Sequence, residues 1–412
     1  MKVCLSRRLM FIVWLTAAAL IAAGSIAAQS PLPAGDPAAV GLDPGKLRDA
    51  TALLRQFVAD RKIAGGVAAV ARQGRVVYLE AVGVQDLASR SPMTPTSLFR
   101  IYSMTKPVTA VAVMMLHEAG RFQLDDPVAK YLPEFDAVMV AGGQGDPPRR
   151  PSRPISIQDL LLHTSGLSHR TSELYRSARV RSRSISLQTF ISNITRAPLM
   201  EDPGTRFRYS EATTVLGRLV EVWSGQPFDA FLEAKIFKPL AMSDTMFVVG
   251  AGKRSRLTTV YAPTPAGDLE ATETEDLPFT ERPPLIEGAV GLVSTVPDYL
   301  RFCQMLLNKG TLDGARLLQP STVDRMTRNG LPDAVLAARG GPMGWGLANV
   351  NVQMDQASPL VGEYGWDGTA GTIFWNDPAR QMITILMTQS VPANPDGIRQ
   401  KFKAAVQAAV IE

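Results

Sequence analysis

The chain has 412 residues, of which 46% are hydrophobic, 20% charged and 7% aromatic. This composition is typical of a globular protein with a sizeable core, and it excludes a disordered, collagen-like or disulfide-scaffold chain. The formal net charge of +5 falls to +2 if a basic N-terminal segment with Lys2, Arg7 and Arg8 is removed. So small a charge does not indicate a nucleic-acid partner.

Residues 1–28 have the pattern of a secretory signal peptide. A short basic stretch precedes an apolar run from Leu9 to Ala23, and small residues suited to cleavage follow at Ala27 and Ala28. The alternative is a membrane anchor, but the run is shorter than the roughly 20 residues that a span needs. We therefore expect an exported protein, periplasmic or secreted, without a stable membrane anchor.

In chain order, hydrophobic periodicity predicts a helix at 46–60 and then a β-hairpin at 66–83 whose strands are separated by Gln73-Gly74. A stretch rich in Gly and Pro at 141–154 predicts a loop. The remaining predicted elements are helices at 104–120, 157–162, 186–194, 212–224, 297–309 and 395–411, and strands at 344–350, 371–375 and 381–387. Strands at both ends predict a sheet domain made from 29–100 and 345–412, with a mostly helical domain inserted over 101–344.

Few residues are suited to holding a metal. Once Cys4 is removed with the signal, Cys303 is the one cysteine left, so no internal disulfide and no cysteine-based metal site can form. His117, His163 and His169 lack ligand spacing such as His-Glu-x-x-His. We expect no metal and no cofactor, a structural role for His163 and an exposed loop position for His169. The sequence predicts no particular oligomeric state.

Ser103-Met104-Thr105-Lys106 is the strongest chemical motif. It is the one place where a serine lies three residues before any of the 11 lysines. If a helix begins at Met104, Ser103 is its N-cap and Lys106 lies on the same face one turn later. A helix N-terminus favours a developing oxyanion and lowers the pKa of a nearby lysine, which could then take the serine proton. The alternative is an ordinary helix start.

Two further motifs carry candidate chemistry. Tyr209 follows the Pro203-Gly204 turn and precedes a predicted helix, where a phenol could move a proton. The segment 366–372 contains Gly368 and Gly371, so its backbone could approach a ligand and supply an N–H to an oxyanion hole. The alternatives are a tyrosine packed under a turn and a glycine-rich bend.

Taken together, these motifs resemble those of the serine β-lactamase and penicillin-recognising superfamily. More narrowly, the chain resembles class C β-lactamases and the carboxylesterases that share their fold, called family VIII esterases. Further landmarks occur in matching order at 161–167 (Leu-Leu-His-Thr-Ser-Gly-Leu), 288–295 and 344–346 (Gly-Trp-Gly). The resemblance implies an α/β fold of the β-lactamase/transpeptidase type, with an antiparallel sheet flanked by terminal helices and an inserted mostly helical domain.

The resemblance also implies roles for particular residues. Ser103 would be the acylated nucleophile, and Lys106 and Tyr209 would share the general base and acid work. The backbone N–H groups of Ser103 and Thr369 would form the oxyanion hole. No Gly-x-Ser-x-Gly motif is present, which counts against the α/β-hydrolase fold.

The sequence departs from the β-lactamase pattern at the substrate side. Trp366 stands where that pattern has the lysine of Lys-Thr/Ser-Gly, Glu211 stands where it usually has asparagine, and Asp367 adds a second acid. Loss of the cation and gain of two acids should disfavour the carboxylate of a β-lactam. A tryptophan at this position is typical of the esterase branch.

We therefore expect a serine hydrolase that cleaves small neutral esters through an acyl-enzyme. The substrate would contact four residues (Trp366, Asp367, Gly368 and Glu211). The alternatives are a class C-type β-lactamase or D-amino-acid peptidase, a non-catalytic penicillin-binding domain, and an acyltransferase. A local arginine cluster is either a solvated face of the helical insert, or a lid or a surface for anionic partners; its members are Arg149, Arg150, Arg153, Arg170, Arg176, Arg179, Arg181 and Arg183.

Overall fold

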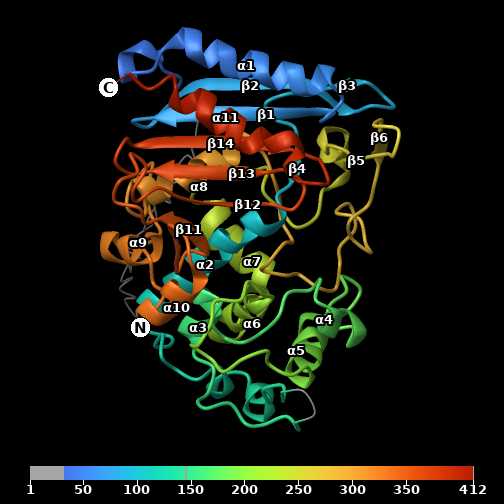
Figure 1. Ribbon diagram of the computed structural model, residues 1–412, viewed down its shortest axis with the longest axis vertical. Coiled ribbons are helices and arrows are strands. Elements are labelled where there is room, and N and C mark those ends of the chain that lie inside the picture. Colours follow the sequence, from blue (N-terminus) through green and yellow to red (C-terminus); the bar gives the residue numbers. More distant parts are fainter. Residues whose placement is uncertain (1–31, 144–145, 412) are drawn as a thin grey trace, which may run out of the picture.

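The computed structural model describes residues 32–143 and 146–411, so the predicted signal peptide lies outside the described residues. A large sheet and the two terminal helices occupy the upper part of Figure 1, and most other helices lie below them. No helix in the described part is both long and apolar enough to cross a bilayer.

The main sheet has eight strands, all in antiparallel pairs, in the order β10-β11-β12-β13-β14-β1-β2-β3. Its strands are β1 (Gly65–Arg72), β2 (Arg75–Asp86), β3 (Ser91–Pro92), β10 (Met343–Gly346), β11 (Val350–Gln353), β12 (Tyr364–Asp367), β13 (Ile373–Asp377) and β14 (Met382–Thr388). Three smaller pairs are β4 (Phe99–Arg100) with β7 (Val293–Ser294), β5 (Tyr261–Pro263) with β6 (Leu269–Ala271), and β8 (Thr311–Leu312) with β9 (Ala315–Arg316). Strands from both ends of the chain therefore meet where β14 pairs with β1, which confirms the predicted fold class.

The predicted hairpin is confirmed as β1 and β2. Its two turn residues, Gln73 and Gly74, both have positive φ, 52° and 75°. Such a pair matches the right-handed twist of the flanking strands and closes the hairpin with two residues.

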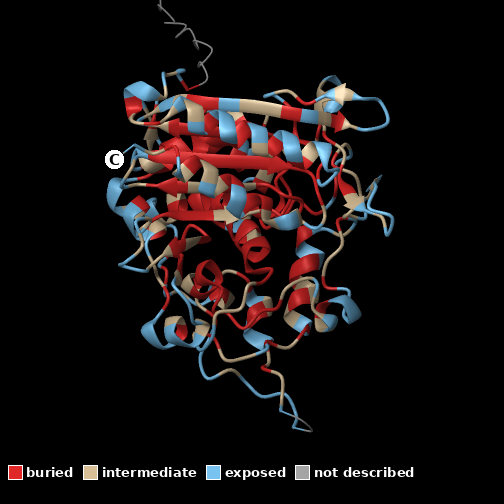
Figure 2. Cartoon of the chain, turned by 45° about the horizontal axis from the view of Figure 1, so that its top comes forward, coloured by how far each residue is buried: buried red, intermediate tan, exposed pale blue. Residues whose placement is uncertain are grey.

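The sheet buries both of its faces because helices cover each side. In β1, Val67 and Ala69 point into the core on the face opposite α1 and α11, and Ala68 and Val70 point into the core under those two helices. Alternate residues of a strand point to opposite faces, so a strand with small apolar residues throughout fits a central position. The helices that cover this second core are α1 (Pro44–Ala59) and α11 (Ile398–Gln407). Figure 2 shows the strands largely buried and the outward sides of these helices exposed.

The remaining helices lie mostly under the sheet. They are α2 (Thr105–Glu118), α3 (Ile157–Leu162), α4 (Glu173–Ser177), α5 (Leu187–Arg196), α6 (Ala212–Ser224), α7 (Phe228–Leu232), α8 (Val296–Leu307), α9 (Pro320–Thr327) and α10 (Asp333–Arg339). Helix α8 packs directly on β14 and β1, although it falls in the segment predicted as the helical domain. The predicted division at 101 and 345 stays a prediction.

Several predicted element bounds differ from the structure, and three of these differences have a clear local backbone reason. The strand predicted at 344–350 is two strands, because Asn349 adopts a left-handed φ of 58° and turns the chain. The strand predicted at 371–375 begins at Ile373, because Gly371 has a φ of 99°. The closing helix begins at Ile398, because Asp396 has a φ of 47°. Each positive φ ends regular structure.

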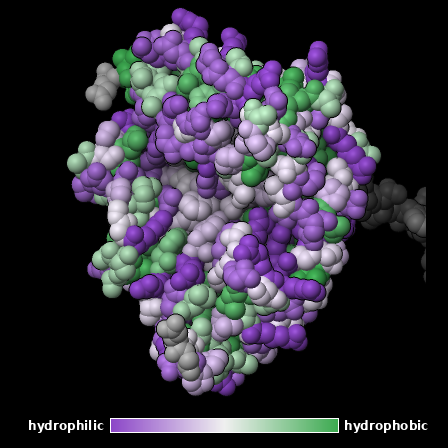
Figure 3. Space-filling model, turned by 45° about the vertical axis from the view of Figure 1, so that its right-hand side comes forward, coloured by the Kyte–Doolittle hydropathy of each residue, from purple (hydrophilic) through white to green (hydrophobic). Residues whose placement is uncertain are grey.

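The surface gives no sign of one dominant apolar patch on the face shown in Figure 3. Hydrophilic residues cover most of this face, and the apolar residues are scattered among them. Scattered apolar residues are ordinary on a protein surface and indicate no docking site.

Candidate active site

Ser103 lies in a tight turn before a helix. The turn is the 3₁₀ helix η2 (Tyr102–Met104), and α2 begins at Thr105. The residue directly before α2 is Met104, so the predicted N-cap role of Ser103 is wrong. The physical reason is the positive φ of Tyr102, 41°, which turns the chain sharply and places Ser103 in the turn instead of at the cap.

Lys106 lies in the first turn of α2 and faces Ser103. Its Nζ donates to Ser103 Oγ over 3.2 Å and to the carbonyl oxygen of Ala289 over 3.0 Å. The residue is 1% exposed. Burial lowers the pKa of Lys106 to about 7, although the negative charge of Glu211 raises it in part. Near neutral pH, Lys106 can therefore be the uncharged amine that accepts a proton from Ser103.

The start of α2 is held by residues 288–292, which belong to the landmark at 288–295. Ile101 N–H donates to the Leu292 carbonyl over 3.0 Å, and Leu292 N–H donates to Thr105 Oγ1 over 3.1 Å. Thr109 Oγ1 donates to the Gly288 carbonyl over 2.7 Å. These bonds hold the Ala289 carbonyl against the lysine amine.

Tyr209 closes the other side of Ser103. It lies just before α6, and Lys106 Nζ is 4.7 Å from the centroid of its ring. Trp366 Nε1 donates to the Tyr209 hydroxyl over 3.2 Å. Burial raises the pKa of Tyr209 above its usual value, although hydrogen bonds with Ser103 and Trp366 oppose the rise. The phenol therefore stays protonated and can give a proton.

Aromatic rings enclose Tyr209. The ring centroids of His163 and His169 lie 4.9 Å and 5.6 Å from its own, and that of Trp345 lies 6.1 Å away. His163 is fully buried, and its Nδ1 is 3.0 Å from Ser210 Oγ, in keeping with a structural role. The predicted exposure of His169 is wrong, because this ring stacks on Tyr209 and is half-buried.

The turn after β12 brings Thr369 close to the nucleophile. A side chain at Gly368 would place its Cβ 2.4 Å from the carbonyl oxygen of Ile101, two residues before Ser103. Only glycine permits that approach. Within the described residues the Thr369 N–H has no hydrogen-bond acceptor. It is therefore available to an oxyanion.

Arg399 of α11 supports this turn from behind. Its Nη2 donates to the Gly368 carbonyl over 2.7 Å and to the Thr372 carbonyl over 3.2 Å, and its Nη1 pairs with Asp367. The charge of Asp367 is thus balanced by Arg399. The expectation that Asp367 repels anionic substrates loses its basis, whereas the replacement of a lysine by Trp366 remains.

Glu211 lies directly before α6 and is 1% exposed. Thr214 Oγ1 donates to its carboxylate over 3.3 Å. Burial alone would raise the pKa of Glu211, but the positive charges of Arg170 and Lys106 outweigh this and lower it. The carboxylate therefore stays ionised beside Lys106, and its predicted contact with substrate stays a prediction.

The arginine cluster divides into two parts. Five of its members are exposed (Arg149, Arg150, Arg153, Arg176 and Arg179). Arg170 and Arg181 instead pair with Glu275, over 3.0 Å and 2.6 Å, and Arg181 also pairs with Glu287. Both glutamates are nearly fully buried. The prediction of a solvated face is therefore wrong for Arg170, Arg181 and the buried Arg183. The charges of Arg170 and Arg181 pair with the two glutamates, and the Arg183 guanidinium lies over the Phe279 ring, 4.0 Å from its centroid.

The site thus unites the three residues predicted to do the chemistry: a serine, a buried amine and a partly buried phenol. No group of three or more His, Cys, Asp or Glu side chains suited to a metal occurs among the described residues. The beta-lactamase family profile matches residues 50–409. This chain belongs to the beta-lactamase family. It is a serine hydrolase, and its relatives act on small molecules.

Two relatives in sequence and one solved structure are similar to this beta-lactamase family member over most of its length. Protein Rv1367c of Mycobacterium tuberculosis is 34% identical over 349 residues, covering 80% of this chain and 86% of the relative. Esterase EstB of Burkholderia gladioli is 29% identical over 384 residues, covering 86% and 93%. The structure of EstCE1, a hydrolase with promiscuous acyltransferase activity, superposes with a TM-score of 0.78 at 26% identity, covering 89% and 99%.

Sequence reasoning missed several residues of this site. Ala289 acts through its backbone carbonyl, and Arg399 reaches the turn from the last helix, so no local motif includes either one. His169 meets Tyr209 across 40 positions of sequence. The motif at 288–295 was a usable signal, because it marks the segment that holds the lysine.

Proposed function

We propose that this protein is an exported carboxylesterase that cleaves neutral esters through an acyl-enzyme on Ser103. One observation carries the proposal: a buried Lys106 with a pKa of about 7 donates to Ser103 Oγ beside a protonated Tyr209. A serine is a weak nucleophile unless a neighbouring base removes its proton. The uncharged form of Lys106 supplies that base near neutral pH.

In the proposed first half-reaction, Ser103 Oγ attacks the ester carbonyl carbon while its proton passes to Lys106 Nζ. The carbonyl oxygen becomes an oxyanion held by the N–H groups of Ser103 and Thr369. The tetrahedral intermediate then expels the alkoxide, which takes the proton of the Tyr209 hydroxyl and leaves as the alcohol. Tyr209 regains its proton from the Lys106 ammonium, so both groups return to their starting states.

In the second half-reaction, water replaces the alcohol. Its oxygen attacks the acyl carbon and its proton passes to Lys106 through Tyr209. Collapse of the second tetrahedral intermediate breaks the bond to Ser103 Oγ, which recovers its proton from the Lys106 ammonium. The products are the carboxylic acid and free enzyme.

The preference for a neutral ester is supported by Trp366. The β-lactamase pattern has a cationic lysine at this position, whereas the indole here donates a neutral hydrogen bond to Tyr209. A β-lactam carboxylate gains no attraction from it. The name of esterase EstB supports ester hydrolysis, and EstCE1, described as a hydrolase with promiscuous acyltransferase activity, supports a hydrolase.

The test compares kcat/KM for p-nitrophenyl butyrate with kcat/KM for a chromogenic cephalosporin on one purified batch. We expect the ester to be favoured by at least a hundredfold, about 2.7 kcal/mol of transition-state discrimination. Ser103→Ala is the control and should abolish ester turnover. Preference for the cephalosporin would support the β-lactamase alternative instead.

Export rests on the sequence of residues 1–28. We expect the protein, made in a host with a general secretion pathway, to appear outside the cytoplasm with an N-terminus after Ala27 or Ala28. N-terminal sequencing of the exported protein tests this. A retained protein that begins at Met1 would refute export.

A further inference from the structure

A chain of alternating ion pairs joins three loop segments and ends beside the candidate active site. Arg170 Nη1 lies 3.0 Å from Glu275 Oε1, and Arg181 Nη1 lies 2.6 Å from Glu275 Oε2. Arg181 also donates twice to Glu287, over 3.0 Å from its Nε and again from its Nη2. Along this chain the side chains are 14%, 2%, 11% and 1% exposed. Well-packed apolar residues often stabilise a fold as much as buried ion pairs do, so stability alone does not account for these charges.

The ion-pair chain reaches the amine of Lys106 through the backbone. Glu287 directly precedes Gly288, which is packed so tightly that a Cβ there would lie 2.7 Å from the Thr213 carbonyl oxygen of α6. Only glycine fits at this point. The next carbonyl, that of Ala289, accepts from Lys106 Nζ over 3.0 Å. A displacement of Glu287 would therefore be passed on to the carbonyl that holds the amine.

The loop segment 272–287, which supplies both glutamates, also contacts the residue before Ser103. The structure describes all of this segment, and none of it belongs to a helix or strand. The rings of Phe279 and Tyr102 pack edge to face with centroids 5.9 Å apart, and the Tyr102 hydroxyl is hydrogen-bonded to Thr274 Oγ1. The φ of Tyr102, 41°, is strained for an aromatic residue and persists only where surrounding contacts hold it. The segment therefore supports the turn of the nucleophile as well as the lysine.

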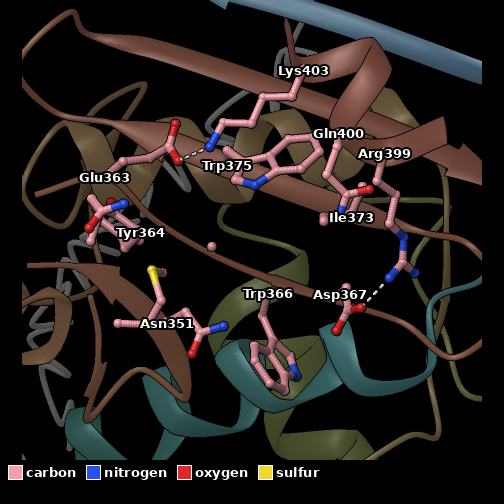
Figure 4. A pocket seen from close by; sticks show the side chains of 13 residues that line it. Asn351, Glu363, Tyr364, Trp366, Asp367, Ile373, Trp375, Arg399, Gln400 and Lys403 are labelled. Carbon is pink, nitrogen blue, oxygen red and sulfur yellow. Dashed lines mark hydrogen bonds and ion pairs between the residues drawn. The ribbon is translucent and has the colours of Figure 1, made fainter. Parts of the chain in front are cut away.

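The elements packed around Lys106 present several charged or titratable groups to it: Glu211 before α6, Arg170 before α4, Glu287, Asp367 of β12, and the rings of His163, His169 and Tyr209. Burial lowers the pKa of both imidazoles, so they are neutral near pH 7, and the phenol stays protonated. Asp367 is balanced by its pair with Arg399 (Figure 4). Glu211 and Glu287 therefore favour the ammonium form of Lys106, whereas Arg170 favours the uncharged amine.

We propose that the ion-pair chain positions Lys106 and sets its charge, with Arg170 and Glu287 as the positioning residues at its two ends. Arg170 supplies a positive charge that opposes Glu211 near the amine. Glu287 fixes the backbone whose carbonyl accepts a hydrogen bond from the amine, and the two middle residues of the chain keep both ends in place. The inference rests on the proposed role of Lys106 as the base of an esterase, and it assigns residues of two loops to that role.

The test measures the pH profile of kcat/KM for p-nitrophenyl butyrate. Arg170→Gln removes the positive charge, so the midpoint of the profile should rise by about half a pH unit. Glu287→Gln keeps the shape of the side chain and removes a negative charge, so the midpoint should fall by about the same amount. Arg170→Lys keeps the charge and should keep the wild-type midpoint. Arg176→Gln, a change of an exposed arginine in the same region, is the matched control and should also leave it in place.

Shifts of opposite sign are the expected result, because a loss of packing alone would lower kcat/KM without moving the two midpoints apart. Unchanged midpoints, or shifts of the same sign, would overturn the inference. Circular dichroism shows whether each variant is folded. If Glu287→Gln is not, Arg170→Gln and Arg170→Lys decide: an upward shift in the first variant alone supports the inference, and equal midpoints overturn it.

The proposed function fails in a different way. A wild-type protein that does not turn over p-nitrophenyl butyrate would defeat the esterase proposal and this inference with it. Wild-type turnover that depends on pH, together with midpoints that the variants do not move, would defeat this inference alone.

Discussion

The indole N–H of Trp366 donates to the hydroxyl of Tyr209 across 3.2 Å. This bond links strand β12 to the residue that transfers protons in the proposed mechanism. In the β-lactamase pattern a lysine stands where this chain has Trp366. The exchange puts a neutral donor in place of a cation, next to the group that would protonate the leaving alcohol. In the proposed mechanism, substrate preference and proton transfer both depend on this one side chain.

Replacing Trp366 by Phe keeps an aromatic ring and removes this donor. A hydrogen bond of this kind contributes about 0.5–1.5 kcal/mol, so kcat/KM for p-nitrophenyl butyrate should fall roughly 2- to 12-fold. Steady-state kinetics on Trp366→Phe and wild type check this. An unchanged kcat/KM would show that the bond does not assist the reaction.

The rate should depend on the protonation of Lys106. Burial lowers the pKa of Lys106 to about 7, and only the uncharged amine can accept the Ser103 proton. We therefore predict that kcat/KM rises with pH and levels off above about 7. Lys106→Arg should be inactive at every pH tested, because a guanidinium stays protonated.

Glu211 should set the position of that rise. Its negative charge favours the protonated form of Lys106, so Glu211→Gln should move the midpoint of the pH profile to lower pH. Glu270→Gln, a change of an exposed glutamate, is the matched control and should leave the midpoint in place. A midpoint that moves upward in Glu211→Gln would contradict the electrostatic account.

Arg399 should hold in position the turn after β12, which carries the Thr369 N–H. Arg399→Met removes the bonds to the Gly368 and Thr372 carbonyls, so Thr369 N–H should lose its alignment. Since removal of an oxyanion donor costs about 10²–10³ in kcat, its misplacement should lower kcat roughly 10- to 100-fold with a smaller change in KM. Kinetics at a temperature where the variant is folded, as judged by circular dichroism, measure this. A change confined to KM would indicate a different role.

An arginine that pairs with a buried glutamate should stabilise the fold, whereas an arginine in an exposed ion pair should not. Arg181→Met leaves the buried carboxylate of Glu287 without this partner, which should lower the free energy of unfolding by about 3–5 kcal/mol. Arg176→Met breaks an exposed pair with Glu173 and should leave stability close to unchanged. Urea titrations of both variants compare them, and equal effects would refute the distinction.

Much of the fold could be predicted because local patterns determine it. The small apolar run at 67–71 and the Gln73-Gly74 turn specify a central hairpin, and both are confirmed. Ser103, Lys106 and Tyr209 could be identified because short motifs surround each of them. Tyr209 is brought to Ser103 and Lys106 by tertiary structure, and the resemblance to the family predicts this arrangement.

The remainder could not be predicted because it depends on single backbone angles or on distant partners. The positive φ of Tyr102, 41°, moves Ser103 out of the N-cap position, and no residue preference predicts such an angle for tyrosine. The partners of Asp367 and Arg181 lie 32 and 106 positions away along the chain. Their charges therefore could not be assigned to paired or free states from the sequence.

The central claim is that Ser103 carries the acyl group, and acid-quenched mass spectrometry tests it most directly. Wild-type protein mixed briefly with excess p-nitrophenyl butyrate should gain the mass of one butyryl group, located on the peptide that contains Ser103. Ser103→Ala should gain none. A butyryl group on another residue, or ester turnover by Ser103→Ala at the wild-type rate, would contradict the account.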